Sequence, residues 1–143
     1  MRKSELMTLW NVESWTVEPY GVYFVSRRLG TNRLENVGQA FQKLNISCTS
    51  YTEVEVLSLP MWKQLSVELD ELDQLAQELI QQEIPQEESV VLMLTDIMLD
   101  KSGCYDAFAL GYDVGESPAG HLYVLVSFDE NFTVQQDVIY ETL

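Results

Sequence analysis

The residue types that carry most protein chemistry are scarce in this chain. There is one histidine, His121, and there are two cysteines, Cys48 and Cys104, among 143 residues. The cysteines are far apart and form no CxxC pair, which argues against a zinc site. A Cys104–His121 dyad would suit nucleophilic catalysis. A small buried thiol and a polar histidine at the start of a strand are the simpler interpretation.

Oxygen-ligand and nucleotide motifs are missing as well. Asp96, Asp100 and Asp106 are too widely spaced for a calcium loop, and apolar residues lie between them. The chain has no GxSxG and no Walker A pattern, and GYDVGESPAG at 111–120 precedes a strand instead of opening a helix. We therefore expect no metal site, no cofactor and no catalytic residues, so the protein is predicted not to be an enzyme.

Carboxylates beside tyrosines are the remaining candidates. Paired carboxylates can do acid-base chemistry in a shared pocket, although Asp near strand ends is also a common turn residue. At an interface, tyrosine rings supply rigid buried area and carboxylates pair with Lys or Arg at the rim. Some of the tyrosines could equally belong to the core. The predicted partner-binding residues are Asp106, Tyr112, Asp113, Glu116, Tyr123, Asp129 and Glu130.

The charge of the chain is strongly negative and unevenly distributed. Eight basic and 23 acidic residues give a formal net charge of −15. Only two of the basic residues, Lys63 and Lys101, follow residue 44. Such a field repels nucleic-acid phosphates and anionic membranes and attracts basic proteins, although acidity also serves solubility alone. The basic stretch SRRLGTNR at 26–33 lacks interleaved aromatic residues, so it predicts no direct nucleic-acid binding; it could pair with the acidic half or mediate self-association.

Length and composition predict a single domain over 1–143, because a hydrophobic content of 46% can build one core. The start, MRKSELMTLWNVES, has no sustained apolar run, and no stretch reaches the ~18 apolar residues of a membrane span. We expect a cytoplasmic protein, monomeric or weakly dimeric, with reduced thiols. A Cys48–Cys104 bridge stays open at this point.

Apolar spacing predicts two helices. Residues 33–45 fit a short helix with apolar residues three and four positions apart. A longer helix is predicted over about 60–82, with Ser58 as its N-cap and Pro60 in its first turn. Its wide apolar stripe favours packing across a sheet over a coiled coil. The stripe comprises Trp62, Leu65, Leu69, Leu72, Ala76 and Leu79, widened by Leu75 and Ile80.

The segment LSVELDELDQLAQELIQQEIPQEE at 65–88 carries eight acidic residues and neither Lys nor Arg. The apolar stripe alone explains the helix, and the acids lie on its other face, where solvation suffices. Salt-bridged pairs four residues apart are usual on an exposed helix, and they cannot form here. The helix is therefore expected to contribute to a one-sided negative field.

Strands are predicted on both sides of these helices. One lies within SWTVEPYGVYFVSRRLG at 14–30, a long one covers 46–59, and VVLMLTDIML at 90–99 is typical of a strand buried on both faces. YDAFALGYDV and HLYVLVSF flank a turn, as in a hairpin, and FTVQQDVIYETL supplies a last strand with Val134, Val138 and Tyr140 facing inward. The order β-α-β-α-β-β-β-β predicts an α+β domain, with a mainly antiparallel sheet and two helices packed on one face.

The stretches VELDELDQLAQEL and DAFALGYDVGESPAGHLYVLVSFDENF, in a short negative chain without catalytic motifs, resemble the small acidic immunity proteins of bacterial toxin systems. The resemblance is one of general character and carries over no binding residue. It implies a cytoplasmic bacterial protein that neutralises a basic toxin domain, such as a nuclease, which must be basic to hold phosphate. The alternatives are a DNA mimic or other regulator of a nucleic-acid-binding protein, a small hydrolase using carboxylates, and an oligomeric adaptor that uses the stripe over 62–79 as its interface.

Overall fold

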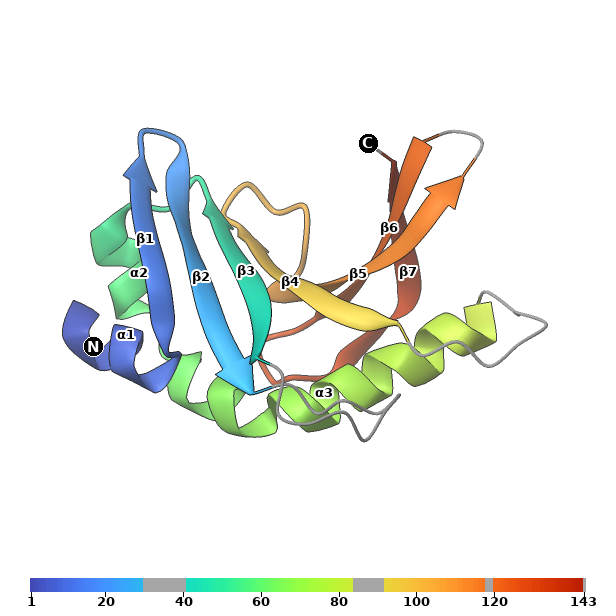
Figure 1. Cartoon of the computed structure of the whole chain (residues 1–143), viewed down its shortest axis with the longest axis horizontal. Coiled ribbons are helices and arrows are strands. Elements are labelled where there is room, and N and C mark those ends of the chain that lie inside the picture. The colour runs from blue at the N-terminus through green and yellow to red at the C-terminus, as the bar shows by residue number, and fades with distance from the viewer. Residues whose placement is uncertain (30–40, 84–91, 118–119, 143) are drawn as a thin grey trace.

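Seven strands form one sheet, and their order in space is their order along the chain. The computed structural model describes residues 1–29, 41–83, 92–117 and 120–142. Neighbouring strands are antiparallel except β3 and β4, which are parallel because α2 and α3 carry the chain back across the sheet (Figure 1). The elements are α1 (Lys3–Leu9), β1 (Val12–Glu18), β2 (Gly21–Leu29), β3 (Phe41–Thr49), α2 (Glu53–Ser58), α3 (Trp62–Glu83), β4 (Met93–Asp100), β5 (Phe108–Ser117), β6 (Gly120–Phe128) and β7 (Val134–Thr142).

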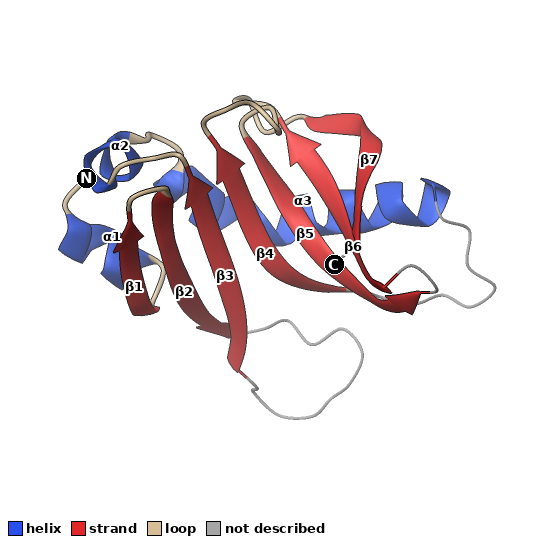
Figure 2. Ribbon diagram, turned by 90° about the horizontal axis from the view of Figure 1, so that it is seen from above, coloured by secondary structure: helices blue, strands red, loops and turns tan. Residues whose placement is uncertain are grey.

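The helices pack on one face of the sheet, as the sequence predicts. The described residues contain three helices instead of two, and both α2 and α3 lie between β3 and β4, so the predicted order β-α-β-α-β-β-β-β is wrong. Leu6 of α1, Val56 of α2 and Trp62 of α3 belong to the same buried core. Figure 2 shows α3 running behind the sheet across the strands. Alternate side chains of the strands form the other half of this core, and the most buried of them are Val22, Phe24, Leu44, Ile46, Cys48, Ile97, Leu99, Phe108, Leu110, Tyr112, Val124, Val126 and Phe128.

The opposite face of the sheet is concave. The sheet bends so that β1–β3 and β5–β7 rise on either side of β4, and α3 lies beneath the bend (Figure 1). No helix of the described part of the chain covers this concave face (Figures 1 and 2). Its side chains therefore meet solvent or each other, which makes it the natural place for a binding site.

The predicted apolar stripe of α3 is confirmed and forms the centre of the core. Its six stripe residues and Ile80 are at most 7% exposed. Leu75, expected to widen the stripe, is 43% exposed, whereas Gln77 is buried instead. The Gln77 side chain binds both backbone groups of Leu92, accepting a hydrogen bond from its N–H at 3.0 Å and donating to its carbonyl oxygen. Because an unpaired buried amide is unfavourable, this clamp fixes the start of β4 against α3.

A second polar contact holds α3 over the C-terminal strands. The hydroxyl of Tyr112, a fully buried residue of β5, donates a hydrogen bond of 2.6 Å to Asp73 Oδ1 on α3. Hydrogen bonds to charged acceptors are shorter and stronger than neutral ones. This bond sets where α3 lies along the sheet.

Two of the predicted elements are wrong. The helix predicted over 33–45 lies partly outside the described residues, and residues 41–45 belong to strand β3. Burial alternates in β3, with Leu44, Ile46 and Cys48 on the core side, so the strand period prevails over the helical spacing. The long strand predicted over 46–59 ends at Thr49.

Helix α2 replaces the second half of that predicted strand. Thr52 and Glu55 form a capping box, in which each side chain accepts from the backbone N–H of the other. This local motif satisfies the first backbone donors of the helix and decides the conformation. The predicted N-cap is also wrong, because Ser58 ends α2 and its hydroxyl donates to the Val54 carbonyl.

Other differences concern the N-terminal half and β4. Residues 3–9 form α1, which was not expected, and the single strand predicted within 14–30 is part of a hairpin of β1 and β2. The segment IPQEES at 84–89, which follows α3, lies outside the described residues. The strand predicted within 90–99 exists as β4, but only its Leu94, Ile97 and Leu99 side is buried, so burial on both faces is wrong. The C-terminal hairpin and last strand are confirmed, although Tyr140 is 53% exposed.

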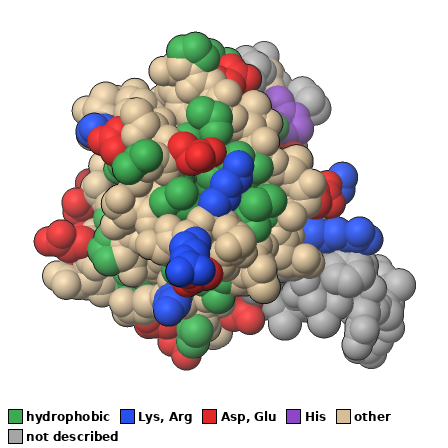
Figure 3. Space-filling model, turned by 90° about the vertical axis from the view of Figure 1, so that its left-hand side faces the viewer, with side chains coloured by type: hydrophobic (Ala, Val, Ile, Leu, Met, Phe, Trp, Pro, Cys, Tyr) green, Lys and Arg blue, Asp and Glu red, His purple; other side chains and the backbone are tan. Residues whose placement is uncertain are grey.

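The few basic residues lie on the N-terminal side of the molecule. Lys3, Lys43 and Lys101 form ion pairs with Glu53, Glu13 and Glu55 respectively. Figure 3 shows this side, where Lys and Arg lie among carboxylates and hydrophobic side chains. The excess negative charge therefore lies on the rest of the protein surface.

Leu69→Ala is expected to lower the free energy of unfolding by about 2–5 kcal/mol, because the side chain is 1% exposed and its removal leaves a cavity. Val67 lies on the same helix and is 82% exposed, so Val67→Ala should change stability by less than about 0.5 kcal/mol. Urea denaturation followed by circular dichroism measures both. Equal effects of the two substitutions would contradict the assigned core face of α3.

Candidate functional site

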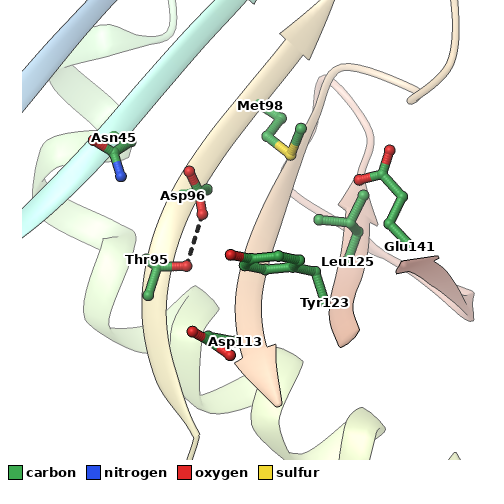
Figure 4. Close-up of a pocket in the computed structure, with 8 residues that line it drawn as sticks. All are labelled: Asn45, Thr95, Asp96, Met98, Asp113, Tyr123, Leu125 and Glu141. Atoms are coloured by element: carbon green, nitrogen blue, oxygen red, sulfur yellow. Dashed lines mark hydrogen bonds between the residues drawn. The ribbon is translucent and has the colours of Figure 1, made fainter. Parts of the chain in front are cut away.

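The concave face has a hollow at its centre. Asn45, Asp96, Gly111 and Leu125 are cross-strand neighbours in one row from β3 to β6. Asp96 and Leu125 approach each other closely over Gly111, since a Cβ atom at Gly111 would lie 3.1 Å from both Asp96 Cβ and Leu125 Cδ2. The hollow has a volume of about 390 Å³. It is lined by Asn45, Thr95, Asp96, Met98, Asp113, Tyr123, Leu125 and Glu141 (Figure 4).

Asp96 is half-buried on the β4 side of this pocket. A β-bulge between Leu94 and Asp96 shifts the register of β4 against β5, and Asp96 pairs with Gly111 after it. The Thr95 hydroxyl donates a hydrogen bond of 2.7 Å to Asp96 Oδ2. Burial raises the pKa of Asp96 above its ordinary value, and the charge of Asp113 acts in the same direction, whereas hydrogen bonds from Thr95 and Asn45 oppose the shift.

Asp113 is the second carboxylate of the pocket, and it is held in place from two sides. Its Oδ1 lies 2.6 Å from Nε2 of His121 and accepts a hydrogen bond of 2.9 Å from the Gly115 backbone N–H. The His121 ring lies 4.9 Å from the ring of Tyr123, measured between centroids. In Figure 4, Asp96 and Asp113 lie on either side of Thr95, and the hydroxyl end of Tyr123 points toward β4.

Glu141 lines the pocket from β7, and Tyr105 contacts another of its lining residues, Met98. Glu141 is the cross-strand neighbour of Tyr123, so Tyr123 stands between Asp113 and Glu141 in one row. Tyr105 belongs to the loop between β4 and β5, and its hydroxyl lies 3.9 Å from the Met98 sulfur. Burial raises the pKa of Tyr105 to about 12, and the nearby charge of Glu141 adds to the shift. The phenol is therefore neutral near pH 7 and lies beside a carboxylate.

The predicted binding residues do not form one cluster. Asp113 and Tyr123 line the pocket. Tyr112 is fully buried against α3, so its side chain offers no surface to a partner. The side chain of Glu116 lies outside the described residues.

The remaining predicted residues lie at the other end of the β5–β6 hairpin. Asp106 is exposed, and its backbone N–H donates to the Ser127 hydroxyl. Asp129 organises the turn to β7 by accepting hydrogen bonds of 2.9 Å from the backbone N–H groups of Asn131 and Thr133. Glu130 is exposed in the same turn. None of these three carboxylates lines the pocket.

Sequence reasoning did not select Asn45, Thr95, Asp96 or Glu141 as binding residues. Asp96 was considered only as a calcium ligand, although a charged residue inside the apolar run VVLMLTDIML is itself a signal. Asn45 and Glu141 carry no such signal, because only the order of the strands brings β3 and β7 to the same concave face.

The two cysteines and the histidine do not form a catalytic dyad or a bridge. Cys48 is buried in β3 and Cys104 is exposed, and both are free thiols. Burial raises the pKa of Cys48 to about 12, and a hydrogen bond with Asp100 raises the pKa of Cys104, so neither thiol is activated as a nucleophile. His121 contacts Asp113 and Tyr123.

Two kinds of chemistry are open to carboxylates in such a pocket. A carboxyl group with a raised pKa can transfer a proton, and a pair of carboxylates can bind a cation. Thr95 and Asn45 form hydrogen bonds that favour the charged form of Asp96, and His121 lies within hydrogen-bond distance of Asp113. Within the described residues, no Lys or Arg forms an ion pair with Asp96, Asp113 or Glu141. The arrangement is therefore better suited to binding a cationic group than to transferring a proton.

Comparison of the chain with protein-family models, with curated proteins and with solved structures gives no match. In the described residues, no three His, Cys, Asp or Glu side chains are grouped in a way that could hold a metal ion. Nor is any helix there long and apolar enough to cross a membrane.

Asp96→Asn is expected to raise the melting temperature at pH 7 by roughly 2–4 °C, because it removes a half-buried charge that opposes folding. The folded chain holds the Asp96 proton to a higher pH than the unfolded chain, whose value is near 3.8. Just above pH 3.8 the folded state therefore binds more protons, and wild-type stability falls as the pH rises through this window. The advantage of the variant should shrink as the pH is lowered from 7 toward 4.

Thermal unfolding of both proteins across this pH range measures the effect. Glu71→Gln is the matched control, since it neutralises an exposed carboxylate on α3. If Asp96→Asn destabilised the protein at pH 7 while Glu71→Gln did not, the Asp96 charge would be stabilising and the assignment of this pocket as a binding site would lose its energetic support.

Proposed function

We propose that this protein binds a basic protein partner on the concave face of its sheet and blocks it, as an immunity protein blocks a bacterial toxin. One observation carries the proposal. Asp96, Asp113 and Glu141 line a pocket on an uncovered concave face, and the Lys and Arg ion pairs of the described residues lie elsewhere. A basic surface entering this face would supply the missing positive charge.

The distribution of charge supports rapid association with such a partner. The chain has a net charge of −15, and three of the four lysines within its described parts are paired with N-terminal glutamates. A negative field of this kind steers a basic protein to the surface and raises the association rate. A nuclease domain must be basic to hold its phosphate substrate, so it is the kind of partner that this field selects. Asp106, Asp129 and Glu130 would act through this field at the rim of the interface.

Half-buried carboxylates next to aromatic rings would determine how long the complex lasts. Rim charges mainly change the association rate, whereas desolvated pairs at the centre of an interface mainly change the dissociation rate. Asp96 and Tyr123 lie in the pocket, and the Tyr105 hydroxyl contacts Met98, another residue of its lining. Aromatic residues and charged partners in such central positions carry most of the binding energy of protein complexes.

The shape of the site makes the alternatives less suitable. A DNA mimic needs carboxylates spaced along a surface like phosphates, whereas these carboxylates line a hollow. An adaptor based on the stripe over 62–79 would need that stripe exposed, but its residues are at most 7% exposed within the chain. A hydrolase would need a nucleophile or an activated water, and neither Cys48 nor Cys104 is activated as a nucleophile.

Two variants with the same change in net charge test the proposal. The concave-face variant is Asp96→Asn, Asp113→Asn, Glu141→Gln, and the helix variant is Glu71→Gln, Glu78→Gln, Glu83→Gln, all exposed on α3. Each is immobilised and used to capture proteins at low salt from a lysate of bacteria that carry the gene. We expect the concave-face variant to lose a basic partner that the wild type and the helix variant both retain.

The captured protein is identified by mass spectrometry, and its activity is measured with and without the wild type. Equal loss of capture in both variants would mean that the negative charge acts without a defined site. Retention by the concave-face variant, or a captured partner that stays fully active, would contradict the proposed inhibition.

A further inference from the structure

We infer that the hollow lined by Asp96, Asp113 and Glu141 receives one arginine side chain of the partner. This inference rests on the proposed function, because it names the group of the basic partner that enters the concave face. It depends on three features of the described residues, which are the position of the carboxylates, the nature of the walls and the size of the hollow.

The three carboxylates line the same hollow. Asp96 is the cross-strand neighbour of Gly111, and Asp113 lies two residues further along β5 on the same face. Diagonal neighbours in an antiparallel pair are about 7–8 Å apart, so a planar cation between them can reach both with hydrogen bonds of about 2.8 Å. Glu141 lies on the far side of Tyr123 in the next row. A guanidinium group, with five donors in one plane, can use several acceptors at once.

The carboxylates are already oriented for this contact. The Thr95 hydroxyl holds Asp96 Oδ2 at 2.7 Å, and Asp113 Oδ1 lies 2.6 Å from His121 Nε2. Each carboxylate keeps a second oxygen for another donor. Because the acceptors are held in place before binding, little conformational entropy is lost when the cation arrives.

The walls of the hollow suit a flat cation with an aliphatic stem. Tyr123 presents an aromatic ring, and Met98 and Leu125 present apolar groups on the same lining. Guanidinium groups are weakly hydrated and stack on aromatic faces, whereas the ammonium of lysine is a strongly hydrated point charge. A half-buried site with apolar walls therefore selects arginine over lysine.

The size of the hollow suits such a side chain. Its volume is about 390 Å³. Pockets of about 300–1,000 Å³ hold small ligands. One inserted arginine would be a central anchor of the kind that dominates protein interfaces.

Three capped peptides test the inference directly: Gly-Gly-Arg-Gly-Gly, its lysine analogue and its citrulline analogue, which has the shape of arginine without the charge. Each is titrated into ¹⁵N-labelled protein, and the backbone amide signals of Gly111, Tyr123 and Leu125 are followed by NMR. We expect saturable shifts of these signals with the arginine peptide, several-fold weaker binding of the lysine peptide and no saturation with citrulline.

Variants assign the binding to the hollow. Asp96→Asn should weaken the arginine peptide about tenfold, since a hydrogen bond to a charged group is lost. Glu71→Gln, on the opposite face of the molecule, should leave its affinity unchanged. Tyr123→Leu should reduce the preference for arginine over lysine. Circular dichroism verifies that each variant is folded.

Equal binding of the arginine and citrulline peptides, shifts confined to α3, or unchanged affinity in folded Asp96→Asn would overturn the inference. Its failure is distinguishable from failure of the proposed function. If a basic partner is captured through the concave face but the arginine peptide does not bind, the inference is wrong and the proposed function stands. If the peptide binds in the hollow and no partner is inhibited, the arginine site is correct and the proposed inhibition is wrong.

Discussion

The burial of the α3 stripe against the sheet is the contact on which the rest of the structure depends. One long helix provides apolar residues along its whole length, and strands β2 to β6 supply the facing buried side chains of a single core. The parallel pairing of β3 and β4 requires the chain to cross the sheet between them, and α3 makes that crossing. Gln77 and Tyr112 add polar contacts that tie the helix to β4 and β5. The position of the helix thus determines which face of each strand is buried.

Because the helices cover one face of the sheet, only the other face is open to a binding partner. An antiparallel sheet can keep one side solvated, and here that side is bent into a concave surface. Carboxylates from β4, β5 and β7 converge in the hollow at its centre. Burial, with a smaller contribution from the charge of Asp113, lowers the preference of Asp96 for its charged form, as its raised pKa indicates. A cluster that is unfavourable in the free protein becomes favourable when a cation is added, which is the physical basis of the proposed binding.

Particular residues show how far the sequence could predict this fold. The repeat from Trp62 to Leu79 predicted both the helix and its buried face, because spacing along a helix is a local property. The C-terminal hairpin followed from turn residues between apolar strands. The prediction of one long strand over 46–59 was wrong. Valines at alternate positions favour a strand, but the capping box of Thr52 and Glu55 starts a helix. The prediction for Leu44 was wrong in a similar way, since its spacing fitted a helix while its pairing with Ser26 of β2 placed it in a strand.

The candidate site was predicted only in part, through Asp113 and Tyr123. Composition, net charge, the long helix and the antiparallel C-terminal strands follow from the sequence by itself, because each depends on residue types or on spacing between near neighbours. The tertiary structure alone decided that Tyr112 faces the core, and that Asn45, Asp96 and Glu141 share one pocket although 96 positions separate the first from the last. These side chains meet only through the order and register of the strands. That order results from the packing of the whole sheet on α3, which no local pattern encodes.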